Sequence, residues 1–273
     1  MILAFCSISA LDRSLADAAR IAAGAGLDGL EVTAHKPHLD PEDGLDAARA
    51  AGRAVRAAGV GVTAYGSYLG RFGQIERAHA QREAAIAEAL ETPLLRVWAE
   101  PIAEGSTDIA PVIDLMRVAC DAALGAGITV VIERHLGSFA DTPDRIAQLL
   151  RAIDRPNVAL NYQVLDFLPH SEIDAQPADA ARLVECARYF HLKNYQPNPA
   201  GEGPVFPGGS LSGGVLDYRA ILHAALAAGY TGPFTIEFLA ADPRPVEAKL
   251  AEDVAFVRNV LQEAVGDAHA AAR

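Results

Sequence analysis

The chain has 273 residues, of which 51% are hydrophobic and 21% charged, a composition that supports a large folded core. The length suits a single α/β barrel. A formal net charge of -12 and the lack of a basic stretch argue against a nucleic-acid partner. Cys6, Cys120 and Cys186 show no CxxC spacing, so we expect reduced thiols.

The first ten residues, MILAFCSISA, form a short apolar run without a basic start or a cleavage site. We interpret this segment as a first strand and not as a signal peptide. No apolar run in the sequence approaches the length of a transmembrane helix. The sequence therefore predicts a cytoplasmic protein with no membrane partner.

Eight short runs of β-branched or apolar residues follow one another along the chain, each separated from the next by an Ala-rich stretch of helical spacing. Several of these stretches end in a glycine just before the next run, as at Gly59, Gly127 and Gly229, which is typical of helix C-caps. The predicted strands cover residues 2–7, 29–35, 61–67, 94–100, 128–135, 157–163, 189–195 and 233–239.

Eight strands that alternate with helices predict a parallel sheet with right-handed crossovers, closed into a (β/α)8 TIM barrel. An open, doubly wound sheet is the alternative, but the G-x-G-x-x-G turn that often follows its first strand is missing. We expect a single catalytic domain over residues 1–265 and a disordered tail over residues 266–273.

Side chains of a barrel strand alternate between the barrel interior and the surrounding helices. In TVVIERH (129–135) the apolar set points outward and takes Arg134 with it as a surface charge, and in PFTIEFL the outward set includes Phe238. On the later strands, the side chains predicted to face the barrel interior are Thr129, Val131, Glu133, His135, Asn161, Gln163, Tyr189, His191, Lys193, Thr235 and Glu237. The earlier strands add Glu31, Thr33, His35, Arg96, Trp98 and Glu100.

Polar residues gather in the later half of four successive strands, where the catalytic residues of such barrels lie. A single strand-end Glu or His is more often solvated or paired, and Arg96 could bridge to Glu100 or Glu133 as a purely structural contact. Four adjacent strands that all end this way favour a site. Its wall would be formed by Glu133, Gln163, His191 and Glu237.

Two carboxylates, one imidazole and one amide oxygen suit a divalent ion such as Mn²⁺, Mg²⁺ or Co²⁺, and Zn²⁺ less well. Open positions on such an ion could bind adjacent oxygens of a polyol or keto-sugar. The ion would then polarise the carbonyl group while a neighbouring carboxylate moves the proton.

The motifs VVIERH, FHLKN, GGVLDY and AAGYTGPFTIEF resemble those of the xylose-isomerase-like TIM-barrel superfamily, and within it the sugar phosphate isomerase/epimerase group. The resemblance implies a metal held by Glu133, His191 and Glu237, with the two glutamates as catalytic acid and base. Gln163 stands where the family usually has an aspartate, and Asp166 stands where it has a histidine. The change at position 163 removes one negative charge from the implied ligand set.

Six further residues are predicted to bind the substrate, either as a stacking wall or through substrate oxygens; Tyr65 is a further candidate for the wall. The segment 194–214 is long and rich in Gly and Pro, so it could act as a lid or remain a plain surface loop. The six residues predicted to bind the substrate are His35, Arg96, Trp98, His135, Asn161 and Lys193.

The sequence thus predicts a metal-dependent isomerase or epimerase of a ketose or related polyhydroxy carbonyl compound that works through an enediolate. One alternative is a metal-dependent lyase, which would dehydrate or β-eliminate a keto-sugar, an inosose or a keto-glycoside. Another is a non-catalytic sugar-binding subunit. A homo-oligomer is also possible, as is common in the resembled family.

Overall fold

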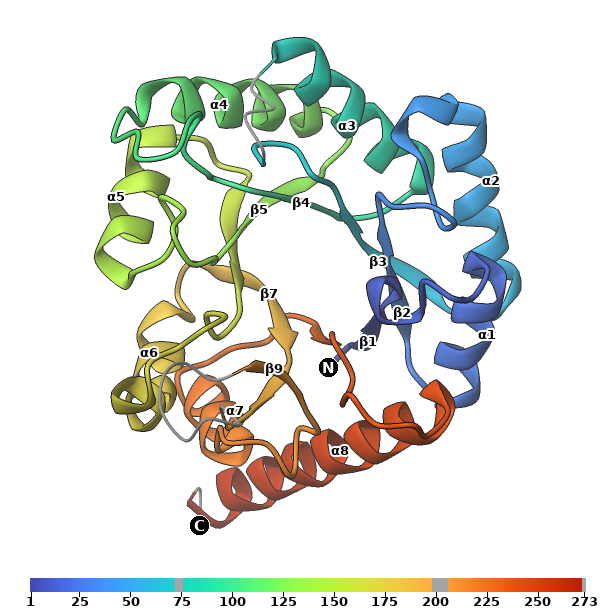
Figure 1. Ribbon diagram of the computed structural model, residues 1–273, viewed down its shortest axis with the longest axis vertical. Helices are drawn as coiled ribbons and strands as arrows, with labels where there is room; N and C mark the ends of the chain where they lie inside the picture. Colours follow the sequence, from blue (N-terminus) through green and yellow to red (C-terminus); the bar gives the residue numbers. More distant parts are fainter. Residues whose placement is uncertain (72–75, 198–205, 272–273) are drawn as a thin grey trace.

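The computed structural model describes residues 1–71, 76–197 and 206–271. Figure 1 looks down a closed ring of strands that is surrounded by helices. The strands pair in the order β1-β10-β7-β6-β5-β4-β3-β2, and every pair in the ring is parallel. The prediction of a single-domain (β/α)8 barrel is confirmed.

The eight barrel strands all fall within or next to the predicted segments, and the helices fall between them. The strands are β1 (Leu3–Cys6), β2 (Gly29–Thr33), β3 (Gly61–Gly66), β4 (Leu94–Val97), β5 (Thr129–Glu133), β6 (Val158–Tyr162), β7 (Ala187–Leu192) and β10 (Phe234–Ile236). The α-helices within the described residues are α1 (Leu15–Gly24), α2 (Gly44–Ala57), α3 (Arg77–Leu90), α4 (Ala110–Leu124), α5 (Pro143–Ile153), α6 (Gln176–Leu183), α7 (Tyr218–Ala227) and α8 (Val246–Ala271). Short 3₁₀ helices are η1 (Ser7–Ala10), η2 (Pro41–Asp43) and η3 (His170–Ala175).

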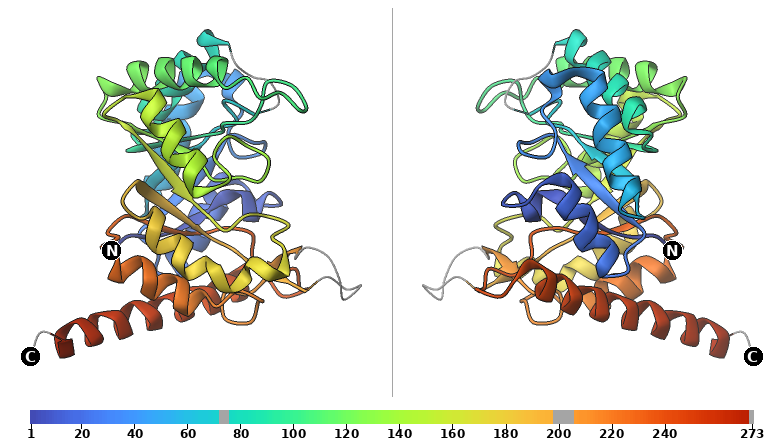
Figure 2. Two further views of the ribbon diagram at one scale, coloured as in Figure 1. Left: turned by 90° about the vertical axis from the view of Figure 1, so that its left-hand side faces the viewer. Right: turned by 90° about the vertical axis from the view of Figure 1, so that its right-hand side faces the viewer.

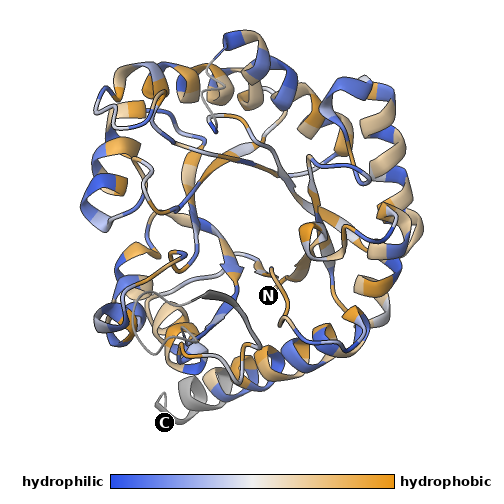
Figure 3. Ribbon diagram, in the orientation of Figure 1, coloured by the Kyte–Doolittle hydropathy of each residue, from blue (hydrophilic) through white to orange (hydrophobic). Residues whose placement is uncertain are grey.

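The alternation predicted along the strands is present. Outward residues such as Val130, Leu160 and Phe234 join the main apolar core together with the helices. Figure 3 shows hydrophobic and hydrophilic stretches alternating along the outer helices, as expected when one face of each helix packs on the barrel. A smaller apolar cluster fills the barrel interior and consists of Ala64, Leu94, Val131, Ala159 and Tyr189.

Two predictions for outward residues need correction: Arg134 does face the helices, but it is not a surface charge. Arg134 is only 2% exposed, because its guanidinium pairs with Asp179 of α6 at 2.9 Å. Phe238 does not pack under the helices: its backbone φ of 48° interrupts the strand alternation, and its ring lines a cavity at the end of the barrel.

The segment 194–214 contains a two-stranded antiparallel sheet of β8 (Asn194–Gln196) and β9 (Phe206–Gly209). Its later part is tied to α8, since the Leu211 N–H donates to Asp253 at 2.8 Å. Residues 198–205 lie outside the described residues, so a lid function for this segment stays a prediction.

Helix α8 continues to Ala271, through most of the segment expected to be a disordered tail. Figure 2 shows this helix extending past the barrel on the side where the N terminus lies. Across the described residues, no helix combines the length and apolar character that a membrane span requires.

Candidate active site

A cavity of about 280 Å³ lies where β3, β4, β5, β7 and β10 end; we call it the reaction cavity. Six of the predicted site residues line it, namely Arg96, Trp98, Glu133, His135, Lys193 and Glu237. The carboxyl ends of the strands therefore bring these side chains together, as the sequence predicted.

Arg96 is the central cation of the site and is 3% exposed. Its Nη1 lies 2.8 Å from Glu133 Oε2, and its Nε lies 3.5 Å from Glu31 Oε1. Burial by itself lowers the pKa of Arg96, but attraction to Glu133 and Glu31 outweighs burial and raises the pKa. One guanidinium thus pairs with both carboxylates across the barrel interior.

Gly66 at the end of β3 makes room for this ion pair. A Cβ atom on Gly66 would lie 2.4 Å from Glu31 Oε1 and 2.7 Å from Arg96 Nη2. Since Glu31 and Arg96 are both buried, neither side chain has solvent to retreat into. The absence of a side chain at position 66 is a condition for the buried charges.

Gln163, the residue that replaces the family's aspartate, acts as a hydrogen-bond donor. Its Nε2 donates to Glu133 Oε1 at 2.7 Å and to the Arg134 carbonyl oxygen at 2.8 Å. Both partners are acceptors, which fixes the orientation of the amide. Its Oε1 is buried and has no hydrogen-bond partner among the described residues.

His191 lies between two carboxylates in the fully buried part of the barrel. Its Nε2 is 2.7 Å from Glu31 Oε2 and its Nδ1 is 3.4 Å from Glu237 Oε2. The amide nitrogen of Asn161 lies 3.3 Å from the same Nδ1. Burial by itself lowers the pKa of His191, but attraction to Glu237 and Glu31 raises it to about 10. The two neighbouring carboxylates therefore favour the protonated form of the imidazole.

Lys193 supplies the third cation and is 2% exposed. Its Nζ lies 3.1 Å from Asp166 Oδ1 and 3.8 Å from Glu237 Oε2. Burial alone would raise the pKa of Glu237, but His191 and Lys193 together hold that pKa well below its usual range. Glu237 is thus ionised at neutral pH.

Aromatic rings form the outer wall of the reaction cavity. The Trp98 ring lies parallel to Tyr68, with centroids 6.4 Å apart and planes 6° apart, and it forms a T-shaped pair with His135, with centroids 4.8 Å apart. The Arg71 guanidinium covers the Trp98 ring at 3.9 Å. Trp98 is held in place because its Nε1 donates to the Ser67 carbonyl oxygen at 3.1 Å.

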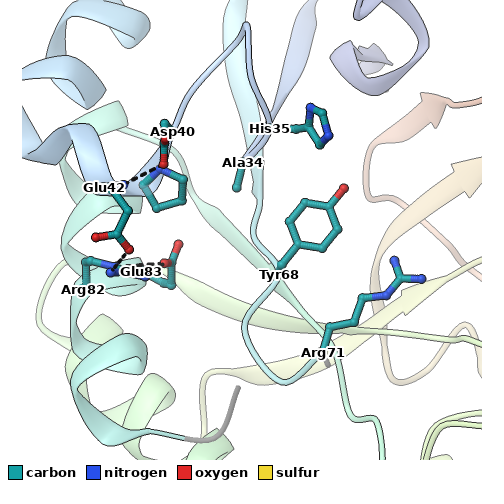
Figure 4. Close-up of a pocket in the computed structure, with 9 residues that line it drawn as sticks. Ala34, His35, Asp40, Glu42, Tyr68, Arg71, Arg82 and Glu83 are labelled. Carbon is teal, nitrogen blue, oxygen red and sulfur yellow. Dashed lines mark hydrogen bonds and ion pairs between the residues drawn. The ribbon is translucent and has the colours of Figure 1, made fainter. Parts of the chain in front are cut away.

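A second cavity of about 560 Å³ adjoins the first and shares Tyr68 and Arg71 with it. Figure 4 shows Tyr68 between His35 and Arg71, with an acidic and basic cluster on the far side of the space. His35 was predicted to bind substrate in the barrel, but it is exposed and lines this second cavity. The other residues that line it are Ala34, Asp40, Pro41, Glu42, Arg82 and Glu83.

The four residues predicted to hold a metal do not fit a divalent ion in this arrangement. Glu133 is paired with Arg96, and Gln163 presents its N–H to Glu133. Both ring nitrogens of His191 face carboxylates, with Nε2 at Glu31 and Nδ1 at Glu237. Nowhere in the described part of the chain do three His, Cys, Asp or Glu residues group in a metal-holding arrangement. A divalent ion here would also be repelled by Arg96 and Lys193.

Residues 19–260 match a family model described as a xylose isomerase-like TIM barrel. The chain belongs to this family. The match covers the barrel from α1 to α8 and confirms the resemblance seen in the strand-end motifs. No curated protein sequence matches the chain significantly.

Several solved structures have the same xylose isomerase-like fold. An L-ribulose 3-epimerase has a TM-score of 0.76 and is 16% identical, over 100% of this chain and 98% of that one. A probable 3-DHS dehydratase from Bacillus anthracis has a TM-score of 0.71 and is 18% identical, over 94% and 99%. A protein from Mycobacterium smegmatis in complex with magnesium has a TM-score of 0.66 and is 21% identical, over 91% and 88%. At these identities the likeness shows the fold alone.

The sequence interpretation missed two residues that shape the xylose isomerase-like site. Glu31 pairs with both Arg96 and His191 and accepts from Tyr189 at 2.8 Å. Its inward position on β2 was predicted, and that was the available signal. Tyr68 lies in the loop after β3, where no strand alternation marks a side chain as inward.

We predict that Gly66→Ala destabilises the protein by about 1–3 kcal/mol, the usual cost of overpacking a filled interior. The added methyl group would push Glu31 and Arg96 apart. Gly61→Ala on the same strand is the control, because its Cβ would meet only the Asp28 carbonyl oxygen at 3.8 Å. Urea unfolding measures both variants, and equal losses would contradict the role given to Gly66.

We predict that Gln163→Asp increases the affinity for Mn²⁺ by at least about tenfold, since site affinity follows the charge of the ligands. The new carboxylate would lose the hydrogen bonds to Glu133 and to the Arg134 carbonyl oxygen and would repel Glu133, and a bound cation relieves that repulsion. Gln163→Met, which loses the same bonds without adding charge, serves as control. Isothermal calorimetry gives the affinities. Tight Mn²⁺ binding by the wild-type protein would contradict the conclusion that the four predicted ligands do not fit a divalent ion.

Proposed function

We propose that the chain is an isomerase or epimerase of a ketose or related polyhydroxy carbonyl compound, and that it acts by proton transfer beside the carbonyl group. The observation that carries the proposal is that two buried carboxylates, Glu133 and Glu237, and the buried ammonium of Lys193 all line one cavity. A proton acceptor, a proton donor and a cation for a developing oxyanion are the groups that such a reaction requires.

The reaction begins when one glutamate takes the proton from the carbon next to the carbonyl group. The electron pair of the broken C–H bond forms a carbon–carbon double bond, and the π pair of the carbonyl group moves onto its oxygen to give an enediolate. Lys193 Nζ, already placed between Asp166 and Glu237, stabilises the new negative charge. Arg96 adds to the positive field and holds Glu133 in one orientation.

The proton then returns to carbon. Delivery by the same glutamate to the neighbouring carbon gives an isomer, while the hydroxyl proton passes from one enediolate oxygen to the other. Delivery to the opposite face of the first carbon gives an epimer. That proton comes from the other glutamate, which first takes one from solvent or, for Glu237, from Lys193 at 3.8 Å, and the first glutamate returns its proton to solvent. In either case no atom is gained or lost, and no oxidant or reductant is needed. The divalent ion implied by the family resemblance enters no step, because the residues in this arrangement do not fit it.

A lyase is the second candidate, and the pairing of His135 with Asp166 favours it. His135 Nε2 lies 3.8 Å from Asp166 Oδ2 at the edge of the reaction cavity. From that position a histidine could protonate a leaving hydroxyl or alkoxide group after the enolate has formed. The product would then contain a carbon–carbon double bond.

We predict that the wild-type protein moves solvent deuterium into a ketose, and that Glu133→Gln and Glu237→Gln each slow this exchange by about 10²–10⁴-fold. The glutamines keep the size of the side chain but cannot accept a proton. Nuclear magnetic resonance in deuterated water, with D-fructose, D-xylulose and L-ribulose as substrates, measures the exchange.

Glu247→Gln, an exposed position on α8, is the matched control and should exchange at the wild-type rate. Full exchange in both active-site variants would contradict the assignment of the acid and base. An unsaturated product would replace the isomerase by the lyase, and binding without any exchange would point to a sugar-binding subunit.

A further inference from the structure

The second cavity lies next to the reaction cavity, because Tyr68 and Arg71 belong to the wall of both. Arg71 also pairs with Glu100 at 3.3 Å, which holds its guanidinium over the Trp98 ring. A molecule whose reacting carbons lie beside Glu133 and Glu237, and which is longer than the reaction cavity, would have the second space as its neighbour at Tyr68.

The sizes of the two cavities indicate a substrate larger than a single small sugar. The reaction cavity measures about 280 Å³, which is just below the usual range of small-molecule pockets, and the second measures about 560 Å³. The second space is thus large enough for another sugar ring or a polyol chain.

The charges in the second cavity argue against an anionic group. Arg82 is bound on both sides, with Nη1 2.5 Å from Glu42 Oε1 and Nη2 3.2 Å from Glu83 Oε1. Asp40 adds a further carboxylate, so three carboxylates face two guanidinium groups. A phosphate would meet at least as much negative as positive charge, whereas neutral hydroxyl groups can donate to the carboxylates and accept from the guanidinium groups.

The entrance between the cavities is lined by flat rings. Tyr68 is half-buried and lines the second cavity with the polar cluster of Glu42, Arg82 and Glu83, while Trp98 lies parallel to it on the side of the reaction cavity. A pocket that combines aromatic walls with a few fixed polar groups binds ligands with both apolar and hydroxyl-bearing faces. A sugar ring has both kinds of face.

We propose that the second cavity binds a neutral, polyhydroxylated substituent of the substrate, so that the natural substrate is a glycoside or another extended sugar and not a sugar phosphate. This inference rests on the proposed function of the reaction cavity, but it concerns binding and can be tested without turnover.

The test measures affinity by saturation-transfer nuclear magnetic resonance and calorimetry, with D-glucose, glucose 6-phosphate and the neutral disaccharides maltose, cellobiose, trehalose and sucrose. We expect at least one disaccharide to bind tenfold or more tightly than glucose, and glucose 6-phosphate to bind no more tightly than glucose. Because no reaction is monitored, the result does not depend on the proton-transfer proposal.

Two variants locate the binding. In Tyr68→Ala, and in Glu42→Trp, which fills the second cavity, the advantage of the disaccharide over glucose should disappear, whereas Tyr68→Phe keeps the ring and should retain most of it. Thermal melting checks that each variant is folded. Equal affinity for glucose and every disaccharide, no detectable binding of any disaccharide, or preference for glucose 6-phosphate would overturn the proposal.

Discussion

The buried ionic network around Arg96 is the constraint on which the site depends. Its guanidinium connects Glu31 of β2 with Glu133 of β5, and Glu31 in turn pairs with His191 of β7. Removing any one of these charges would leave a buried partner uncompensated, which is far more costly than losing an exposed ion pair. The network therefore fixes the side-chain positions from which the proposed chemistry follows.

This network also explains how the site differs from the one expected from the family resemblance. A divalent ion compensates carboxylates from a single point, whereas here three separate cations, Arg96, His191 and Lys193, compensate them from different strands. Gln163 fits the second arrangement because an amide can donate to Glu133, which an ionised aspartate cannot do. Gln163 in place of an aspartate and the pairing of Glu133 with Arg96 thus belong to one electrostatic arrangement.

Much of the fold and a good part of the site could be predicted, because strand alternation and strand-end polarity depend on local sequence. Glu133, His191 and Glu237 were placed inward in this way. The partner of each charge could not be predicted, since pairing depends on side-chain reach across the barrel and on the space left by Gly66. Alternation failed at Phe238, where the backbone leaves the strand conformation.

Arg134 shows a different limit of the sequence interpretation. An outward position on a strand is apolar by default, so a charge there suggests the surface, yet Asp179 on α6 reaches it and keeps it buried. The second cavity was missed for a related reason: it is built by η2, α3 and the loop after β3, whose relative positions no local pattern encodes.

The most direct test of the central claim is a crystal structure of the wild-type protein soaked in manganese chloride, with anomalous scattering recorded at the manganese edge. The account predicts no manganese peak in the barrel, with Arg96 bound between Glu31 and Glu133. A manganese peak held by Glu133, Gln163, His191 and Glu237, with Arg96 displaced from Glu133, would contradict it.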